Sequence, residues 1–173
     1  MAPQSAGILI FRRTTGTVQF LLAHPGGPFW SKKDDGSWSI PKGLCQERET
    51  AIDAARRELR EEIGLTITGD LVELGKFKQP SGKVISAWAA ESDFDVAGLR
   101  SNGFSLEWPP RSGSRMEFPE VDRAGWFSFT EAAAKITRGQ LPILLRLATE
   151  LGLDVPAAPK TSSQRTSRRG SRT

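Results

Sequence analysis

One segment constrains the fold of this chain more than any other: PKGLCQERETAIDAARRELREEIGL, residues 41–65. Its apolar and charged residues recur with helical spacing, which predicts a helix over about residues 50–63. Thr50 is placed to be the N-cap of this helix, and Gly64 is a natural C-terminal stop. The segment therefore predicts one amphipathic helix with defined ends.

The predicted helix concentrates its negative charge on one edge. On a helical wheel, Glu58, Glu61 and Glu62 fall within about 100° of the circumference. The arginines mostly point elsewhere, and the neighbouring arc is an apolar candidate core face made of Ile52, Ala55, Leu59 and Ile63. Because like charges so close repel one another, this edge is not built from stabilising i,i+4 ion pairs.

Two interpretations of the acidic edge remain open from spacing alone. In the first, the edge is a solvated face whose charges are balanced by neighbouring elements. In the second, it is a site for a hard divalent cation, because Mg²⁺ and Mn²⁺ prefer carboxylate oxygens. A cation would also remove the repulsion between the carboxylates.

The rest of the chain alternates between predicted strands and helices. Strands are expected at residues 6–12, 17–23, 71–77, 83–91 and 125–129, and further helices from Thr130 and over about 140–151. Residues 24–38 are predicted to be a loop, and residues 92–118 a long irregular segment. This order is typical of an α/β fold in which helices cover a mixed sheet.

Composition divides the chain into a domain and a tail. The net charge is +4, but residues 156–173 carry five basic side chains and no acid, which leaves −1 on residues 1–155. We expect one domain over 1–155 and a disordered tail over 156–173. The tail is either a solvated end or a contact for nucleic acid, and nucleic acid is not otherwise expected as a partner.

The cellular setting is predicted from cysteine content and hydropathy. Cys45 is the only cysteine, so no disulfide can form within the chain, and a reducing, cytoplasmic setting is the default. No apolar run approaches the roughly 20 residues that span a membrane, so no membrane partner is expected.

Nine residues of the opening segment recur at fixed spacing. They match G-x5-E-x7-R-E-U-x-E-E-x-G-U, where U is a bulky aliphatic residue, at Gly43, Glu49, Arg57, Glu58, Leu59, Glu61, Glu62, Gly64 and Leu65. This pattern resembles the signature of the Nudix hydrolases, and the resemblance extends over about residues 5–150. One departure is Arg48, where many members of that family have glycine.

The resemblance implies a fold and an activity. The implied fold is α/β, a mixed β-sheet sandwiched between α-helices. The implied activity is hydrolysis of a diphosphate linkage in a nucleotide with Mg²⁺ or Mn²⁺. The substrate is expected to be a nucleoside triphosphate or a dinucleoside polyphosphate. The alternatives are a non-catalytic nucleotide-binding module, or a nucleic-acid-associated protein that acts through its basic tail.

The resemblance also implies roles for individual residues. The metal ligands would be the Gly43 carbonyl and the side chains of Glu58, Glu61 and Glu62, while Arg57 would orient Glu49 through a bidentate ion pair. The catalytic residues would be Glu61, Glu62 and Glu120. Family members take the general base either from the helix or from a later loop. Glu107, Glu117 and Glu120 are available here, and Glu120 is favoured.

Substrate-binding residues are less constrained by the sequence. Lys42 and Arg12 are candidates for phosphate binding, and Trp38 is the favoured aromatic residue for stacking a base. Trp30 and Trp108 are further aromatic candidates. His24, the only histidine, is expected to have a structural role.

Overall fold

The computed structural model describes residues 3–155, and the tail predicted over 156–173 lies outside the described residues. The strands are β1 (Gln4–Thr14), β2 (Thr17–Pro25), β3 (Lys42–Leu44), β4 (Val72–Lys78), β5 (Val84–Glu91), β6 (Gly103–Glu107), β7 (Arg115–Pro119) and β8 (Val121–Phe127). The α-helices are α1 (Ala51–Ile63), α2 (Phe129–Lys135) and α3 (Leu141–Glu150), and short 3-10 turns are η1 (Val96–Gly98) and η2 (Arg138–Gln140).

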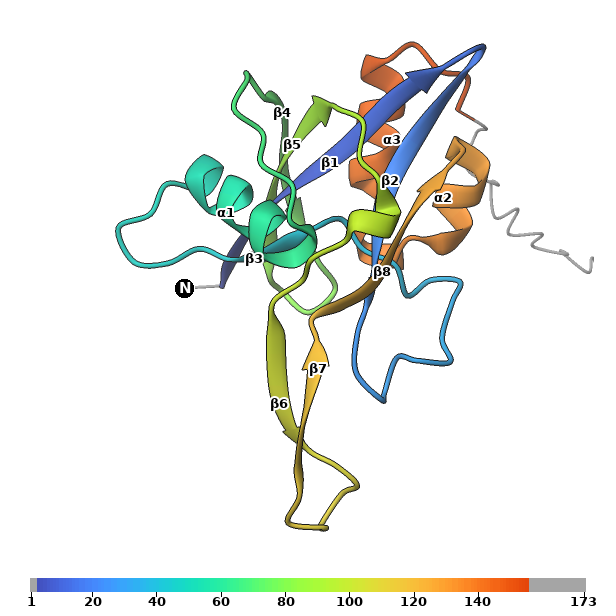
Figure 1. Cartoon of the computed structure of the whole chain (residues 1–173). Coiled ribbons are helices and arrows are strands. Elements are labelled where there is room, and N and C mark those ends of the chain that lie inside the picture. The colour runs from blue at the N-terminus through green and yellow to red at the C-terminus, as the bar shows by residue number, and fades with distance from the viewer. Residues whose placement is uncertain (1–2, 156–173) are drawn as a thin grey trace, which may run out of the picture.

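A mixed sheet forms the middle layer of the molecule (Figure 1). Its strands lie in the order β4-β5-β1-β2-β8, and β3 pairs separately with β1. The β1–β5 pair is parallel and the other pairs are antiparallel. Helix α1 covers one face, and α2 and α3 cover the other, so the predicted α/β/α sandwich is confirmed.

Strand β1 is apolar on both sides because it is the central strand between two helical layers. Ile8 and Ile10 belong to the core under α1, whereas Leu9 and Phe11 belong to the core under α2 and α3. Alternate side chains point to opposite faces of a strand, so one continuous apolar run supplies both cores.

The ends of α1 are as predicted. The Thr50 hydroxyl accepts a hydrogen bond from the Asp53 backbone N–H at 3.3 Å, which caps the first turn. Gly64 adopts φ 82° and donates its N–H to the Arg60 carbonyl, which ends the helix in a left-handed cap. Leu59 and Ile63 are fully buried against the sheet, so the acidic edge beside them has a fixed direction.

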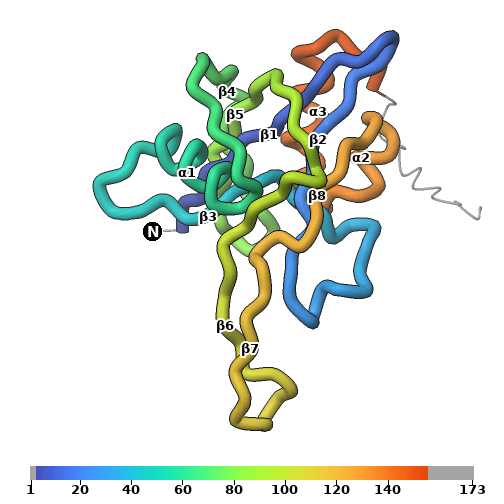
Figure 2. The backbone as a smooth tube through the Cα atoms, viewed as in Figure 1, coloured from blue at the N-terminus to red at the C-terminus, as the bar shows by residue number. Residues whose placement is uncertain are grey.

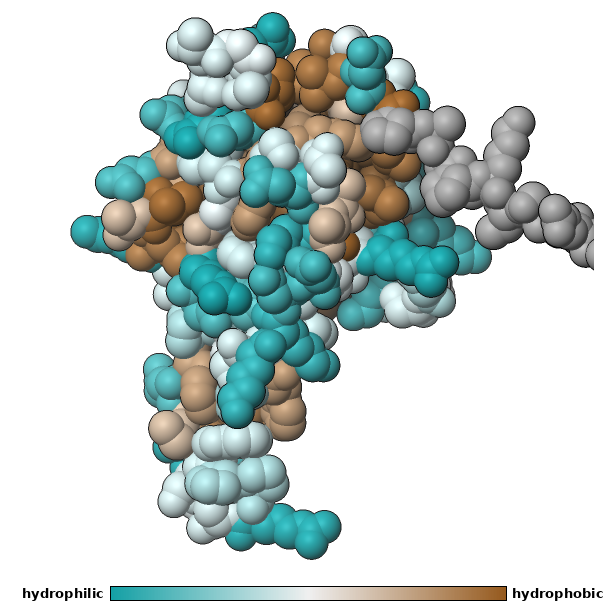
Figure 3. All heavy atoms as spheres, turned by 90° about the vertical axis from the view of Figure 1, so that its right-hand side faces the viewer, coloured by the Kyte–Doolittle hydropathy of each residue, from teal (hydrophilic) through white to brown (hydrophobic). Residues whose placement is uncertain are grey.

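The prediction that residues 92–118 are irregular is wrong for the parts of that segment that form β6 and β7. Strands β6 and β7 pair into a hairpin that projects from the body of the molecule (Figures 1 and 2). Phe104 lies opposite Phe118, and Leu106 lies opposite Met116, so one face of the hairpin is apolar. Figure 3 shows apolar surface along the part of this projection nearest the body. The alternation was obscured because the strands are short and the turn between them is rich in proline, glycine and serine.

Smaller differences concern element ends and one missed strand. Strand β8 begins at Val121, four residues before the predicted start, and α2 begins at Phe129. The three-residue strand β3 was not predicted, because a segment this short carries no periodicity. Within residues 3–155, no helix is long and apolar enough to cross a membrane.

Candidate active site

Four segments that are distant in sequence converge on the acidic edge of α1. A backbone relay joins them: the Asn102 N–H donates to the Glu61 carbonyl, the Glu120 N–H to the Asn102 carbonyl, and the Gly26 N–H to the Glu120 carbonyl, each at 2.8 Å. The relay fixes Glu120, which lies between β7 and β8, beside the C-terminal half of α1. The favoured candidate for the general base is therefore brought to the predicted metal ligands.

Two neighbouring cavities open at this junction. The first, here called the acidic cavity, has a volume of about 490 Å³ and is lined by Gly43, Glu58, Glu62, Glu120 and Phe104, among others. The second, the inner cavity of about 290 Å³, is lined by Glu62, Glu120, Ser39 and Gln140, among others. Pro25, Trp30, Lys42, Glu62 and Glu120 line both cavities, so they form one continuous hollow.

Gly43 leaves room for the Glu58 carboxylate. A Cβ atom added to Gly43 would lie 2.1 Å from the Glu58 Cδ and 2.3 Å from both carboxylate oxygens. No side chain fits there, so this motif glycine allows the carboxylate to rest directly on the backbone of β3. The predicted pair of ligands, the Gly43 carbonyl and Glu58, thus comes from segments in contact.

Glu62 and Glu120 lie in an environment that disfavours their negative charges. Burial, followed by the nearby charges of Glu58 and Glu120, raises the pKa of Glu62 to about 8, although the Lys42 backbone N–H donates to its carboxylate at 3.1 Å. Burial and the charges of Glu58 and Glu61 raise the pKa of Glu120. Carboxylates that repel one another in a partly buried hollow are the donor set that a hard cation would stabilise.

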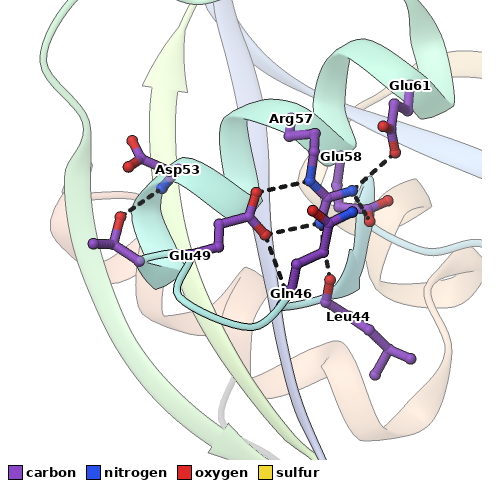
Figure 4. A network of polar contacts seen from close by, with 8 residues as sticks. Leu44, Gln46, Glu49, Asp53, Arg57, Glu58 and Glu61 are labelled. Atoms are coloured by element: carbon purple, nitrogen blue, oxygen red, sulfur yellow. Dashed lines mark hydrogen bonds and ion pairs between the residues drawn. The ribbon is translucent and has the colours of Figure 1, made fainter.

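Arg57 forms hydrogen bonds with several acidic side chains of the motif (Figure 4). Its guanidinium donates to both oxygens of Glu49, at 2.8 and 3.0 Å, which confirms the predicted bidentate pair. It also donates to Glu58 at 2.8 Å, to Glu61 at 2.9 Å and to the Leu44 carbonyl at 2.9 Å. All five of its N–H groups therefore have acceptors, and the helix, the preceding loop and β3 are fixed to one another.

Glu61 differs from the other two glutamates of the acidic edge. Its carboxylate points to Arg57 and it lines neither cavity (Figure 4). Glu58 and Glu62 line the acidic cavity, although Glu58 also accepts a hydrogen bond from Arg57. Cavity lining, not pairing with Arg57, therefore separates Glu61 from the other two predicted ligands. The metal and catalytic roles of Glu61 stay predictions.

Arg48 has a backbone conformation that favours glycine. Its φ is 63°, in the left-handed region that glycine adopts without a steric cost. An L side chain there costs about 1–2 kcal/mol, so this chain keeps the backbone of the motif loop at the expense of strain. The Glu49 side chain accepts from the Gln46 N–H, which closes the same loop.

Two of the predicted substrate-binding residues are not at the hollow. Trp38 is only 6% exposed, because its ring packs edge-to-face against Phe127 and His24 in the core and its Nε1 donates to Asp34. Arg12 stacks over the Trp126 ring at 4.1 Å and pairs with Asp93 at 2.7 Å. It lies five residues along β1 from the residue that pairs with Lys42, a separation of about 17 Å. The predictions for Trp38 and Arg12 are therefore corrected.

Other candidates are at the hollow. Lys42 lines both cavities, as predicted for a phosphate-binding residue. Trp30 also lines both and is 40% exposed, so it can present its ring to a ligand. Phe104 and Gln140 were missed by sequence reasoning. The apolar alternation of residues 103–107 was the available signal for Phe104, but nothing in the sequence indicated Gln140.

His24 is structural, as expected. It is fully buried, and its ring nitrogens lie 2.8 Å from an Asp122 carboxylate oxygen and 2.6 Å from the Lys33 carbonyl oxygen. These contacts hold the loop before Trp38 against β8.

The donor set fits a hydrated divalent cation. Among residues 3–155, no three His, Cys, Asp or Glu side chains are already gathered closely enough to enclose an ion. Mg²⁺ does not require such an enclosure, because it usually takes one or two carboxylates together with waters and substrate phosphates. Glu58 and Glu62, with Glu120 across the hollow, meet that requirement.

Comparison with known proteins identifies the family. A family model described as the NUDIX domain matches residues 1–147. The chain belongs to the Nudix family. An RNA pyrophosphohydrolase from Aeromonas hydrophila is 30% identical to this Nudix chain over 161 residues, which cover 85% of the chain and 89% of that protein. The asymmetrical bis(5'-nucleosyl)-tetraphosphatase of Mus musculus is 32% identical over 111 residues, covering 56% of the chain and 70% of that protein.

Solved structures share the fold. The binary complex of an Ap4A hydrolase from C. elegans superposes with a TM-score of 0.60 at 21% identity, covering 85% of this chain and 96% of that one. The NUDIX domain of Shewanella oneidensis NrtR complexed with ADP ribose gives 0.62 at 13% identity, covering 87% and 89%. The family match and the curated relatives identify the chain as a Nudix pyrophosphohydrolase, a hydrolase acting on acid anhydrides.

Proposed function

We propose that this Nudix protein hydrolyses a diphosphate linkage in a nucleotide with the help of Mg²⁺ or Mn²⁺. The observation that carries the proposal is the convergence of Glu58, Glu62 and Glu120 on one hollow that Lys42 and Trp30 also line. Carboxylates suit a divalent cation, an ammonium group suits a phosphate, and an exposed indole suits a base.

Glu58, Glu62 and the Gly43 carbonyl are the proposed metal ligands. A bound divalent cation would offset the charge of the diphosphate oxygens and lower the pKa of a coordinated water. Arg57 does not touch the hollow and acts by positioning, because it fixes the Glu58 carboxylate through Nη1.

Glu120 is the proposed general base. Its carboxylate lines both cavities, and no residue among 3–155 donates a hydrogen bond to that carboxylate. It is thus available to take a proton from an attacking water, whereas Glu61 is held by Arg57. Phosphoryl chemistry asks the protein mainly for positioning and charge stabilisation. The backbone hydrogen bonds that fix Glu120 beside α1 supply positioning.

The base of the nucleotide is proposed to lie against Trp30 and Phe104. Both rings line the acidic cavity, and they stand on opposite segments, the loop after β2 and the projecting hairpin. They replace Trp38 as the candidates for stacking. The proposed substrates are a nucleoside triphosphate, a dinucleoside polyphosphate or the 5' end of an RNA. The names of two relatives, an RNA pyrophosphohydrolase and a bis(5'-nucleosyl)-tetraphosphatase, refer to the last two of these substrates. A cytoplasmic setting is proposed because the chain has a single cysteine.

The test is the substitution Glu62→Gln, with Glu47→Gln as the matched control. Glu47 is exposed, lies in the same motif loop and lines neither cavity. We expect Glu62→Gln to lose Mg²⁺-dependent hydrolysis by a factor of about 10² or more while its circular dichroism and melting temperature stay close to wild type. Glu47→Gln should retain full activity. Full activity in a folded Glu62→Gln variant would disprove the proposed site.

The substrate is identified by a panel with product analysis. Nucleoside triphosphates, oxidised nucleotides, dinucleoside polyphosphates, 5'-triphosphorylated RNA, ADP-ribose and NADH are compared at equal metal concentration. We expect at least one of these phosphoanhydrides to be hydrolysed at its diphosphate, with the highest kcat/KM marking the preferred class.

A further inference from the structure

A third cavity continues the hollow away from the acidic edge. It has a volume of about 640 Å³ and is lined by Lys83 and Arg138, among others, and here it is called the basic groove. Trp30 and Lys42 line the basic groove as well as both other cavities. Thr137 and Gln140 line the basic groove and the inner cavity. The three cavities therefore form one elongated surface with Trp30 and Lys42 at its middle.

The charge of this surface changes sign along its length. Its far end is lined by Lys83 and Arg138, Lys42 lies at its middle, and no acidic residue lines the basic groove. Within residues 3–155, none of these three cations has a carboxylate within ion-pair distance, whereas Arg12, Arg57, Lys135 and Arg146 all have one. Unpaired cations gathered along one groove attract an anion more strongly than cations already balanced by neighbouring acids.

The groove is a formed feature of the fold. A Cβ atom added to Gly139 would lie 2.5 Å from the Gln79 side-chain oxygen and 2.8 Å from Pro80 Cδ, so η2 packs closely on the β4–β5 turn. Gln140 is 2% exposed, and its side-chain oxygen accepts from the Ile40 N–H at 2.9 Å. This bond fixes η2, which contains Arg138, to the segment that leads into β3. Since η2 also packs on the β4–β5 turn, which contains Lys83, the two basic residues lie on adjoining sides of the groove.

We propose that the basic groove binds an anionic part of the substrate that extends beyond the hydrolysed diphosphate. The inference rests on the proposed function and names its substrate class: a nucleotide with further phosphate that extends from the acidic edge past Lys42 toward Lys83 and Arg138. A polyphosphate bridge to a second nucleoside and the phosphodiester backbone of an oligonucleotide both supply this chemistry. A lone nucleoside triphosphate places little charge so far from the acidic edge.

The experiment compares Lys83→Ala/Arg138→Ala with the control Lys76→Ala/Lys78→Ala. The control removes two exposed lysines of β4 that line none of the three cavities. Steady-state kinetics are measured with a nucleoside triphosphate, diadenosine tetraphosphate and a 5'-triphosphorylated oligonucleotide. Melting temperatures check that each variant is folded, and all four substituted side chains are exposed.

We expect the groove variant to lower kcat/KM for an extended substrate about tenfold relative to the nucleoside triphosphate, chiefly through KM. The control should keep the wild-type ratio. Added salt should weaken the preference of the wild type for the extended substrate more than that of the groove variant. A selective effect on diadenosine tetraphosphate identifies a polyphosphate, and one on the oligonucleotide identifies an RNA backbone. Equal ratios in wild type and groove variant would overturn the proposal.

Failure of the proposed function has a different result. If wild-type protein cleaves none of these substrates, the hydrolytic role fails and uncleaved diadenosine tetraphosphate and oligonucleotide become binding probes. The groove proposal then predicts that the dissociation constant of one of them rises about tenfold in the groove variant but not in the control. Equal affinities would overturn it independently of catalysis.

Discussion

Gly43 shows how the absence of a side chain can place a neighbouring carboxylate. The glycine of β3 gives the Glu58 carboxylate a position directly above the main chain. Arg57 Nη1 then holds that carboxylate from the other side. Contacts on two sides therefore restrict the Glu58 carboxylate.

Substitution of Gly43 tests this arrangement. Gly43→Ala should displace Glu58, because the new Cβ would overlap its carboxylate. We expect a loss of activity and a destabilisation of about 1–3 kcal/mol, the usual cost of overpacking. Gly98→Ala is the control, since no atom lies within 4 Å of an added Cβ there. Kinetics and denaturant unfolding of both variants measure the effect, and a fully active Gly43→Ala would contradict the proposed position of Glu58.

At the scale of the element, α1 and the loop before it behave as one unit. The loop returns to the helix through the bidentate pair of Glu49 and Arg57 (Figure 4). The loop also contains the left-handed Arg48, whose backbone conformation must be held by its surroundings. The Glu49–Arg57 pair and the hydrogen bonds between Gln46 and Glu49 close the loop around it.

The pair predicts a pH dependence of stability. The hydrogen bonds from Arg57 and from the Gln46 N–H lower the pKa of Glu49 from 4.5 to about 2. A lowered carboxyl pKa stabilises the folded state above the ordinary pKa, and this stabilisation is lost as the pH falls from about 4.5 toward 2. Glu49→Gln should therefore have a lower melting temperature than wild type above pH 5, with the difference vanishing near pH 2.

Melting curves at a series of pH values measure this difference. Glu47→Gln is the control, because Glu47 is exposed in the same loop. A difference between Glu49→Gln and wild type that stays constant down to pH 2 would show that the pair does not provide the stabilisation.

At the scale of the whole molecule, the site depends on contacts between distant parts of the chain. Gly26, Asn102 and Glu120 reach α1 through successive backbone hydrogen bonds. The hairpin of β6 and β7 separates Asn102 from Glu120 in sequence, and its pairing returns the chain to the same place. The long surface from the acidic edge to the basic groove exists only because β3, α1, η2 and the β4–β5 turn assemble around it.

The tail yields a prediction from charge alone. Removing residues 156–173 takes away five basic side chains and leaves a net charge of −1. Hydrolysis of free nucleotides should be retained within about twofold, whereas retention on an immobilised polyanion at low salt should fall sharply. A full-length variant with the five basic residues changed to serine is the control for length. Unchanged retention after deletion would exclude the tail as a contact for nucleic acid.

The sequence by itself determined the helix, its ends and the chemistry along its edge. The helical period, the Thr50 and Gly64 caps and the glutamate spacing are local properties of a short segment, and so is the bidentate partner of Arg57. The α/β class followed from the order of apolar segments, because each strand or helix must bury its apolar face against another layer.

Only the tertiary structure decided which residues surround the hollow. Trp38 and Trp30 are both tryptophans in one loop region, yet one ring is buried and the other is 40% exposed. Arg12 and Lys42 are both basic, but only Lys42 lines the hollow, and Glu61 is turned away from it by Arg57. Exposure, direction and proximity arise from long-range packing, which neighbouring residues in the sequence do not specify.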